Sequence, residues 1–290
     1  MYDSKAIFAR HHNYKAMNPV KNLVITTIKR NTVQIHCCAS PDDGERVNAQ
    51  IIETANKLVI IDAMLMRPYA NELREYANSL GKPIDRVFVT HSHPDHWFGI
   101  EYFQDVDVYA FPETIEEIKM FAQIAMDFHR SNHGDLVTDT LFLPNKTITE
   151  NEVTIDGVLF RLFKIVAAED VFMLALDLPE EQTFIAQDLL YNKVHLFVGQ
   201  RSMDGTLCFD GWIAALKQYE NAEYDVVFPG HGVPADISII KENIANLEKV
   251  KSILLSSTGD NFVQNVVEAF PDYGLRSMVE MSAYFLFQMK

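Results

Sequence analysis

Four side chains of metal-ligand type fall within six consecutive residues, in the segment His91-Ser92-His93-Pro94-Asp95-His96. The short apolar run Arg86–Thr90 stops where this segment begins, so we expect a buried strand that leads into it. In extended backbone alternate side chains point the same way, so His91 and His93 can reach one ion. Asp95 and His96 lie past the proline bend and can face a second ion. The segment therefore favours a fold in which the loop after a buried strand presents these side chains to one or two metal ions.

The rest of the chain reads as two rounds of strands followed by helices. Val-, Ile- and Thr-rich runs predict an antiparallel meander of strands at Leu23–Ile28, Val33–Cys38, Asn48–Glu53 and Lys57–Asp62. Helical spacing follows at Tyr69–Leu80 and Pro112–His129. The second round has strands at Val153–Ile155, Val158–Val166, Val171–Leu178, Thr183–Gln187 and Tyr224–Phe228, and helices at Gly211–Tyr219, Ile237–Leu255, Asn261–Ala269 and Leu275–Phe287. This order predicts two sheets packed face to face with helices outside.

Two further ligand-type residues follow apolar strand runs. Asp188 comes just after the run that ends near Ala186, and His231 stands in a Pro-Gly-His-Gly turn just after Phe228. Neutral imidazole and carboxylate groups suit zinc, manganese and iron. Three or four such ligands leave an open position for water, where a nucleophile can be held.

With these residues in place, the chain resembles the metallo-β-lactamase superfamily. His91 to His96 match its HxHxDH signature, and the similarity runs from Asn48 to about Pro234, through Asp62, Gly99, Asp188 and the Gly230–Gly232 turn. The resemblance implies an α/β fold, a four-layer αββα sandwich. It also implies that His91 and His93 bind a first metal, that Asp95, His96 and His231 bind a second, and that Asp188 bridges the two.

One position departs from that family. Where the family has a third first-site histidine, about twenty residues before the bridging aspartate, this chain has Ala167-Ala168-Glu169-Asp170. Two histidines and one glutamate form a known zinc ligand set, so Glu169 can replace the histidine. The alternative is that Glu169 faces solvent and that the first site is weak. If Glu169 binds, the carboxylate-rich shell shifts preference toward manganese or iron relative to zinc.

For several other residues the sequence leaves two possible roles open. Tyr191 lies three residues after Asp188, where lactone-hydrolysing members that it resembles place a tyrosine near the substrate, so it either donates to an oxyanion or packs in the core. His195 either faces the site or is structural. His129 and His133 flank Arg130-Ser131-Asn132 and are expected to be exposed loop histidines, with a lid over the cleft as the alternative. Asp62 is expected to orient a ligand imidazole.

Charge and composition narrow the classes of function. The formal charge of -15, without a Lys/Arg cluster, argues against nucleic acid as a partner. Neither an apolar signal core nor a run long enough to span a bilayer is found, so a cytoplasmic protein without a membrane partner is expected. Cys37, Cys38 and Cys208 are expected to be small buried hydrophobes. Residues 1–290 are expected to form a single metallo-β-lactamase-like domain, with an N-terminal extension over about 1–21 and a C-terminal helical region over about 236–290.

The leading hypothesis is metal-assisted hydrolysis of a small ester, thioester or lactone. One or two divalent ions, with zinc preferred and manganese or iron as options, would activate a water for attack on the substrate carbonyl. Asp95 or Asp188 would hold that water or shuttle its proton, and Tyr191 or a metal would polarise the carbonyl. The alternatives are an iron-dependent oxygen or redox enzyme of the same fold and a non-catalytic metal-binding protein. A homodimer is compatible with the sequence.

Overall fold

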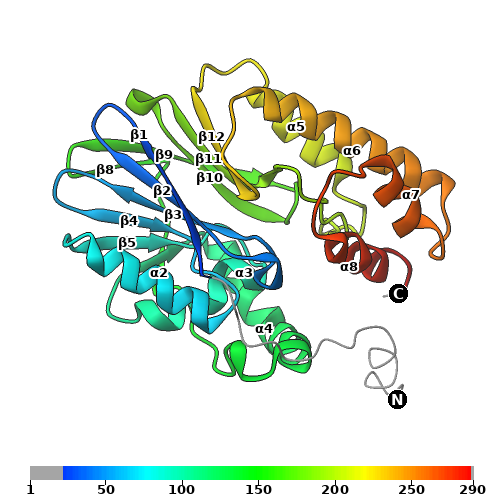
Figure 1. Ribbon diagram of the computed structural model, residues 1–290, viewed down its shortest axis with the longest axis horizontal. Coiled ribbons are helices and arrows are strands. Elements are labelled where there is room, and N and C mark those ends of the chain that lie inside the picture. Colours follow the sequence, from blue (N-terminus) through cyan, green and yellow to red (C-terminus); the bar gives the residue numbers. More distant parts are fainter. Residues whose placement is uncertain (1–21, 289–290) are drawn as a thin grey trace.

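Two mixed sheets lie face to face with helices on both outer faces in the computed structural model, which describes residues 22–288 (Figure 1). This arrangement confirms the predicted αββα sandwich. The predicted N-terminal extension, residues 1–21, lies outside the described residues.

The first sheet holds its seven strands in chain order. They are β1 (Val24–Lys29), β2 (Gln34–Ala39), β3 (Asn48–Glu53), β4 (Leu58–Ile61), β5 (Ile84–Phe88), β6 (Val108–Ala110) and β7 (Lys146–Thr147). Strands β1 to β4 pair antiparallel, which confirms the meander, and β4 to β7 pair parallel. The sequence did not predict β6 and β7, because strands this short carry too little alternation to detect.

The second sheet has five strands in the order β12-β11-β10-β9-β8. Their bounds are β8 (Glu152–Ile155), β9 (Val158–Val166), β10 (Phe172–Leu178), β11 (Thr183–Tyr191) and β12 (Val226–His231). Only β11 and β12 pair parallel, because the chain between them crosses over through a helix.

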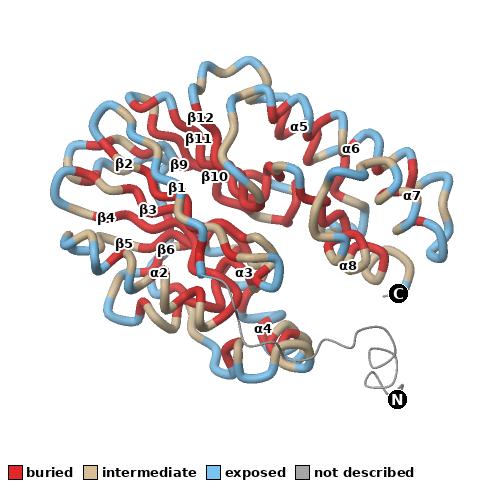
Figure 2. The backbone as a smooth tube through the Cα atoms, in the orientation of Figure 1, coloured by how far each residue is buried: buried red, intermediate tan, exposed pale blue. Residues whose placement is uncertain are grey.

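Three apolar cores hold the layers together. One lies between the first sheet and the helices α2 (Arg67–Ser79) and α4 (Pro112–His133), and the second lies between the two sheets. The third lies between the second sheet and α5 (Phe209–Tyr219), α6 (Ser238–Ser256), α7 (Phe262–Ala269) and α8 (Arg276–Phe287). Short helical turns complete the chain: η1 (Asp42–Gly44), α3 (Pro94–Trp97), η2 (Phe98–Phe103), η3 (Gly134–Leu136) and η4 (Pro179–Glu181). Figure 2 shows the buried backbone concentrated in the strands.

Three predicted element ends were wrong, and two of them lie at ligand-type residues. Strands β11 and β12 continue through Asp188 and His231, so these residues are on the strands rather than just past them. The register of β11 against β12 shifts around Gln187, whose φ is 46°, and this irregularity lets the pairing continue. Helix α4 runs on to His133 and ends at Gly134, whose positive φ of 59° stops it, so the expected turn at residues 130–132 is helical.

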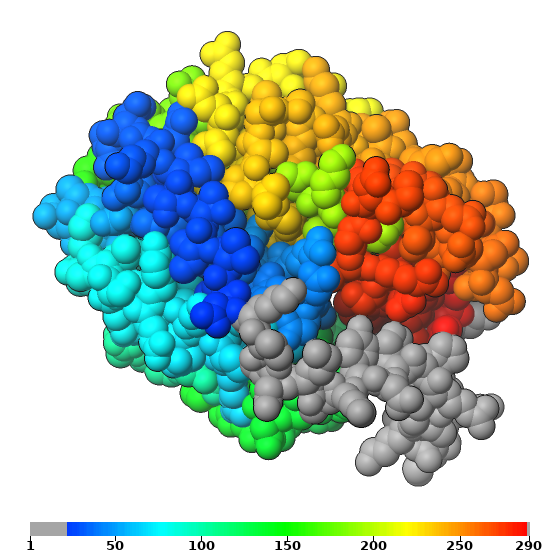
Figure 3. Space-filling model, in the orientation of Figure 1, coloured from blue at the N-terminus to red at the C-terminus, as the bar shows by residue number. Residues whose placement is uncertain are grey.

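The C-terminal helices pack as part of the second half. In Figure 3 the orange and red surface of these residues continues directly from the yellow surface before it. Across residues 22–288, no helix combines the length and apolar character needed to cross a membrane. All three cysteines are free and buried, as predicted.

Candidate metal centre

All seven residues predicted as metal ligands meet at one edge of the two sheets. Their ligand atoms form two groups, each within 4.8 Å: His91, His93, Glu169 and Asp188 in one, and Asp95, His96 and His231 in the other. The HxHxDH segment follows β5, Glu169 lies in the turn between β9 and β10, and Asp188 and His231 lie on neighbouring strands. The site therefore takes side chains from both sheets. That these residues bind metal stays a prediction.

Glu169 completes the first group. His93 Nδ1 lies 3.2 Å from Glu169 Oε1 and 3.2 Å from His91 Nε2, and His91 Nε2 lies 3.6 Å from Glu169 Oε2. Glu169 is buried, with 1% of its surface exposed, so the alternative in which it faces solvent is wrong. Its carboxylate occupies the place that the family resemblance assigns to a histidine.

Asp188 stands between the two groups. Its Oδ2 lies 3.1 Å from His231 Nε2 and 3.9 Å from His91 Nε2, and its Oδ1 lies 3.2 Å from His96 Nε2. In the second group, Asp95 Oδ2 lies 3.3 Å from His96 Nε2 and 3.4 Å from His231 Nε2. One carboxylate thus reaches both groups, as a bridging ligand would.

Three of the imidazoles are oriented by protein groups on their Nδ1 side. His96 Nδ1 donates to Asp62 Oδ2 at 2.7 Å, and His231 Nδ1 donates to the carbonyl of Glu45 at 2.7 Å. His91 Nδ1 lies 3.0 Å from Thr90 Oγ1. Each ring therefore presents Nε2 to the site, the tautomer that a metal requires. Asp62 has the orienting position that the sequence predicted.

The polar atoms left without partners fit a cation in this place. His96 Nε2, Glu169 Oε2 and Asp188 Oδ1 are buried and have no hydrogen-bond partner. Buried polar atoms are nearly always satisfied, and a role in binding an ion is one accepted reason for exceptions. Unsatisfied carboxylate and imidazole atoms within these two buried ligand groups fit divalent cations.

Burial and charge act strongly on these groups. Burial alone would lower the pKa of His93, but the Glu169 and Asp170 carboxylates raise it to about 10. Burial would likewise lower the pKa of His231, and Asp188 and Asp95 raise it to about 10. The carboxylates thus create a negative potential that attracts positive charge, and a bound ion has to displace these protons.

Tyr191 contacts the ligand residues themselves. Its hydroxyl lies 2.8 Å from Asp188 Oδ2 and 3.2 Å from Glu169 Oε1, and its ring stacks on His231 at 4.8 Å. Burial and the Asp188 carboxylate raise the pKa of the phenol well above its usual value, so it keeps its proton. In this structure the phenol donates its one proton to a carboxylate. The contact that Tyr191 makes is therefore one that positions Asp188.

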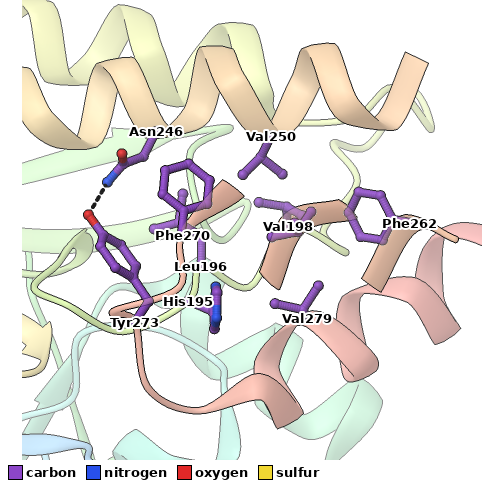
Figure 4. Close-up of a pocket in the computed structure, with 10 residues that line it drawn as sticks. His195, Leu196, Val198, Asn246, Val250, Phe262, Phe270, Tyr273 and Val279 are labelled. Atoms are coloured by element: carbon purple, nitrogen blue, oxygen red, sulfur yellow. Dashed lines mark hydrogen bonds between the residues drawn. The ribbon is translucent and has the colours of Figure 1, made fainter. Parts of the chain in front are cut away.

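His195 and His129 belong to neither ligand group. His195 faces a small apolar cavity formed with helices α6 to α8, beside Tyr273, which agrees with its structural reading (Figure 4). His129 is buried within α4, its ring 5.5 Å from that of Phe98, so the expectation of an exposed loop histidine was wrong for it. The helix continues past the predicted end, and His129 packs against Phe98 rather than facing solvent.

Two residues that contact the ligand loops were missed. Asp170 accepts hydrogen bonds from Ser92, and the Glu45 carbonyl accepts one from His231. The adjacent Glu-Asp pair at 169–170 was a sequence signal for the first. Nothing in the sequence marks Glu45, because its backbone oxygen is what takes part.

Comparison with known proteins agrees with this geometry. Residues 42–231, about two thirds of the chain, match the model of the metallo-β-lactamase superfamily. Three similar solved structures are DIM-1 metallo-β-lactamase exposed to ceftazidime (19% identity, 80% of this chain and 99% of that one, TM-score 0.61), a metallo-β-lactamase from Pontibacter korlensis (19%, 78% and 99%, 0.61) and the mono-zinc form of FIM-1 from Pseudomonas aeruginosa (17%, 80% and 97%, 0.59). At these identities the structures establish the shared fold.

Proposed function

This chain belongs to the metallo-β-lactamase superfamily, and on that basis we propose that it is a metal-dependent hydrolase of a small ester, thioester or lactone. The observation that supports this most is the position of Asp188 between two groups of buried donor atoms. Two adjacent cation sites that share a carboxylate suit hydrolysis, because divalent ions there would polarise a carbonyl and activate water.

The chain's own residues supply orientation and proton handling. Asp62 fixes the His96 ring, and Tyr191 holds the Asp188 carboxylate by a hydrogen bond. Asp95 and Asp188 are the carboxylates in position to accept a proton from an attacking water. For Tyr191 to donate to an oxyanion, its hydroxyl must first leave Asp188, so we propose positioning as its main role.

We propose an ester, thioester or lactone as the substrate rather than a β-lactam. The similar structures are β-lactamases, but one scaffold in this superfamily can serve many reactions, and function lies in the site. Here the first group contains Glu169 in place of a histidine, which adds a negative charge beside the carbonyl that would bind. A β-lactam belongs in the substrate panel as a comparison.

The donor set favours a second candidate function as well. Three carboxylates, from Asp95, Glu169 and Asp188, make an oxygen-rich shell that suits iron or manganese better than an all-histidine shell does. An iron-dependent oxygen or redox enzyme is therefore the runner-up. We propose one or two divalent ions, with zinc first.

The test begins with metal analysis of full-length protein purified without chelators. The same preparation is then assayed with neutral esters, thioesters, lactones and a β-lactam, and its absorption spectrum is recorded for iron. We expect metal at up to two ions per chain and hydrolysis of one carbonyl class. Asp188→Ala should fold but lose metal and activity together. Full activity of Asp188→Ala with unchanged metal content would refute the proposal.

A further inference from the structure

Ser92 lies between the two histidines of the first group, and its backbone N–H, its hydroxyl and its carbonyl all form hydrogen bonds. The Ser92 backbone N–H donates to Asp170 Oδ2 at 3.0 Å, and its hydroxyl donates to the same oxygen at 2.7 Å. Its carbonyl accepts from the Trp97 indole N–H at 2.9 Å. The loop that carries His91 and His93 is therefore clamped at its midpoint.

Asp170 is itself locked in place. It is buried, with 1% of its surface exposed, and its second oxygen, Oδ1, accepts from the Val171 backbone N–H at 2.7 Å. The turn that carries it packs against α5 so closely that a Cβ on Gly211 would lie 2.0 Å from the Ala167 carbonyl. This carboxylate therefore has little freedom to move.

Glu169 and Asp170 are consecutive, and this adjacency links the two halves of the first group. Glu169 contributes its carboxylate to the ligand atoms, while Asp170 holds the loop of the other two ligands through Ser92, 78 positions earlier in the chain. Hydrogen bonds to a charged carboxylate are stronger than neutral ones. The distance between Glu169 and the two imidazoles is thus fixed by one short turn.

We propose that Asp170 is a positioning residue for the first metal site, which holds the His91–His93 loop at binding distance from Glu169. This inference rests on the proposed function, since it assumes that the first group binds a cation. Partners that orient metal ligands commonly change metal affinity by about 10–100-fold when they are removed. Asp62 orients a ligand of the second group directly, by accepting from His96 Nδ1, whereas Asp170 acts through the backbone and hydroxyl of Ser92.

The test measures zinc binding to full-length protein by competition with a chromophoric chelator, after metal has been removed. The variants are Asp170→Asn, Asp170→Ala and Ser92→Ala, and Asp260→Asn is the control, because Asp260 is exposed and far along the chain from the site. Asn keeps the size of the side chain but replaces one acceptor oxygen by a donor. Ser92→Ala removes the hydroxyl bond and leaves the backbone bond.

We expect Asp170→Asn and Asp170→Ala to weaken one of the two zinc sites by about 10–100-fold and to leave the other close to wild type. Ser92→Ala should weaken the same site by less, because one of its two hydrogen bonds to Asp170 remains. Cobalt(II) bound to the variants should give an altered visible spectrum for that site, which a purely structural role would not produce.

Several outcomes would overturn the inference. Wild-type zinc affinity and stoichiometry in Asp170→Asn would do so, as would an equal loss of affinity at both zinc sites. If Asp170→Ala does not fold, the zinc affinities of Asp170→Asn and Ser92→Ala test the inference in its place. Failure of the wild-type protein to bind any metal would instead refute the proposed function, so the two failures are distinguishable.

Discussion

Glu169 is the residue at which this chain differs most clearly from the family pattern. Its side chain is more flexible than that of a histidine and brings a negative charge. Burial raises the pKa of Glu169 to about 7, and the neighbouring His93 opposes that rise. A cation in the first group would hold it ionised, so its ligand role is coupled to metal binding.

Replacing Glu169 tests that role directly. Glu169→Ala should reduce metal content by about one ion per chain, because the first group would keep only two imidazoles and the shared Asp188. Glu169→His should restore binding and favour zinc, if the ring reaches the same position. Metal content is measured by elemental analysis, with Glu150→Ala as an exposed control. Unchanged metal content in Glu169→Ala would show that this carboxylate is not a ligand.

His129 makes a separate prediction about pH. Burial, with help from the stacked His133, lowers the pKa of His129 to about 3, whereas a histidine in an unfolded chain titrates near 6.5. Between these values the unfolded state binds a proton that the folded state does not, so the free energy of unfolding falls as pH falls below about 6.5. The stability from this group is fully present above that pH.

His129→Leu should remove this dependence. Between pH 7 and pH 5 the wild type should lose about 2 kcal/mol relative to the variant. Both proteins lose metal in acid alike, so the difference between their denaturant-unfolding curves isolates His129. Leucine also removes a buried Nδ1 that has no partner. If the free energy of unfolding changed with pH by the same amount in the two proteins, His129 would have to be hydrated in the folded state.

Among the secondary-structure elements, the contact between β11 and β12 determines where Asp188 stands. The two strands pair in parallel, and their register shifts twice, between Ile185 and Gln187 and again between Gln187 and Tyr191, the stretch that contains Asp188. Gly230 of β12 lies directly against it: a Cβ on this residue would be 1.7 Å from Asp188 Oδ1. The glycine is required for close approach rather than for its backbone angles.

Gly230→Ala should therefore displace the Asp188 carboxylate. We expect metal affinity and hydrolysis to fall by at least about tenfold, and the protein to lose about 1–3 kcal/mol of stability through overpacking. Gly259→Ala is the matched control, since its nearest contact would be 3.3 Å away, at the side chain of Phe287. Normal metal binding by Gly230→Ala would show that β11 and β12 separate without cost to the site.

Across the molecule as a whole, the site joins the two halves of the sandwich. The HxHxDH segment belongs to the first sheet, while Glu169, Asp188 and His231 come from the second. Without a cation, the buried carboxylates repel one another and are balanced only by protonated histidines. A bound ion would therefore stabilise the packing of one half on the other.

Metal removal should lower the melting temperature. At a free metal concentration of 100 times Kd, binding adds about 2.7 kcal/mol for one site, which corresponds to a shift on the order of 5–10 °C for a chain of this size. Differential scanning calorimetry of chelator-treated and untreated protein measures this, and added zinc should reverse it. An unchanged transition after the ions are shown to be gone would contradict metal-linked stability.

Local patterns of residues were enough to predict the fold class and most of the ligand-type side chains. Period-two runs are local signals, and they placed the main strands of both sheets to within a few residues. The HxHxDH segment is also local, so its spacing alone could assign its four side chains to two neighbouring groups. Asp188 and His231 were marked by their place after apolar runs, but their roles, and the choice of Glu169, came only from the family resemblance.

Tertiary packing, by contrast, settled which way the ambiguous side chains point. Glu169 turns inward, Tyr191 donates to Asp188, and His129 is buried against Phe98. The clamp of Asp170 on Ser92 joins residues 78 positions apart, and β11 approaches β12 through Gly230. Such contacts depend on how the two sheets pack and on irregularities in strand pairing, which no local pattern of residues encodes.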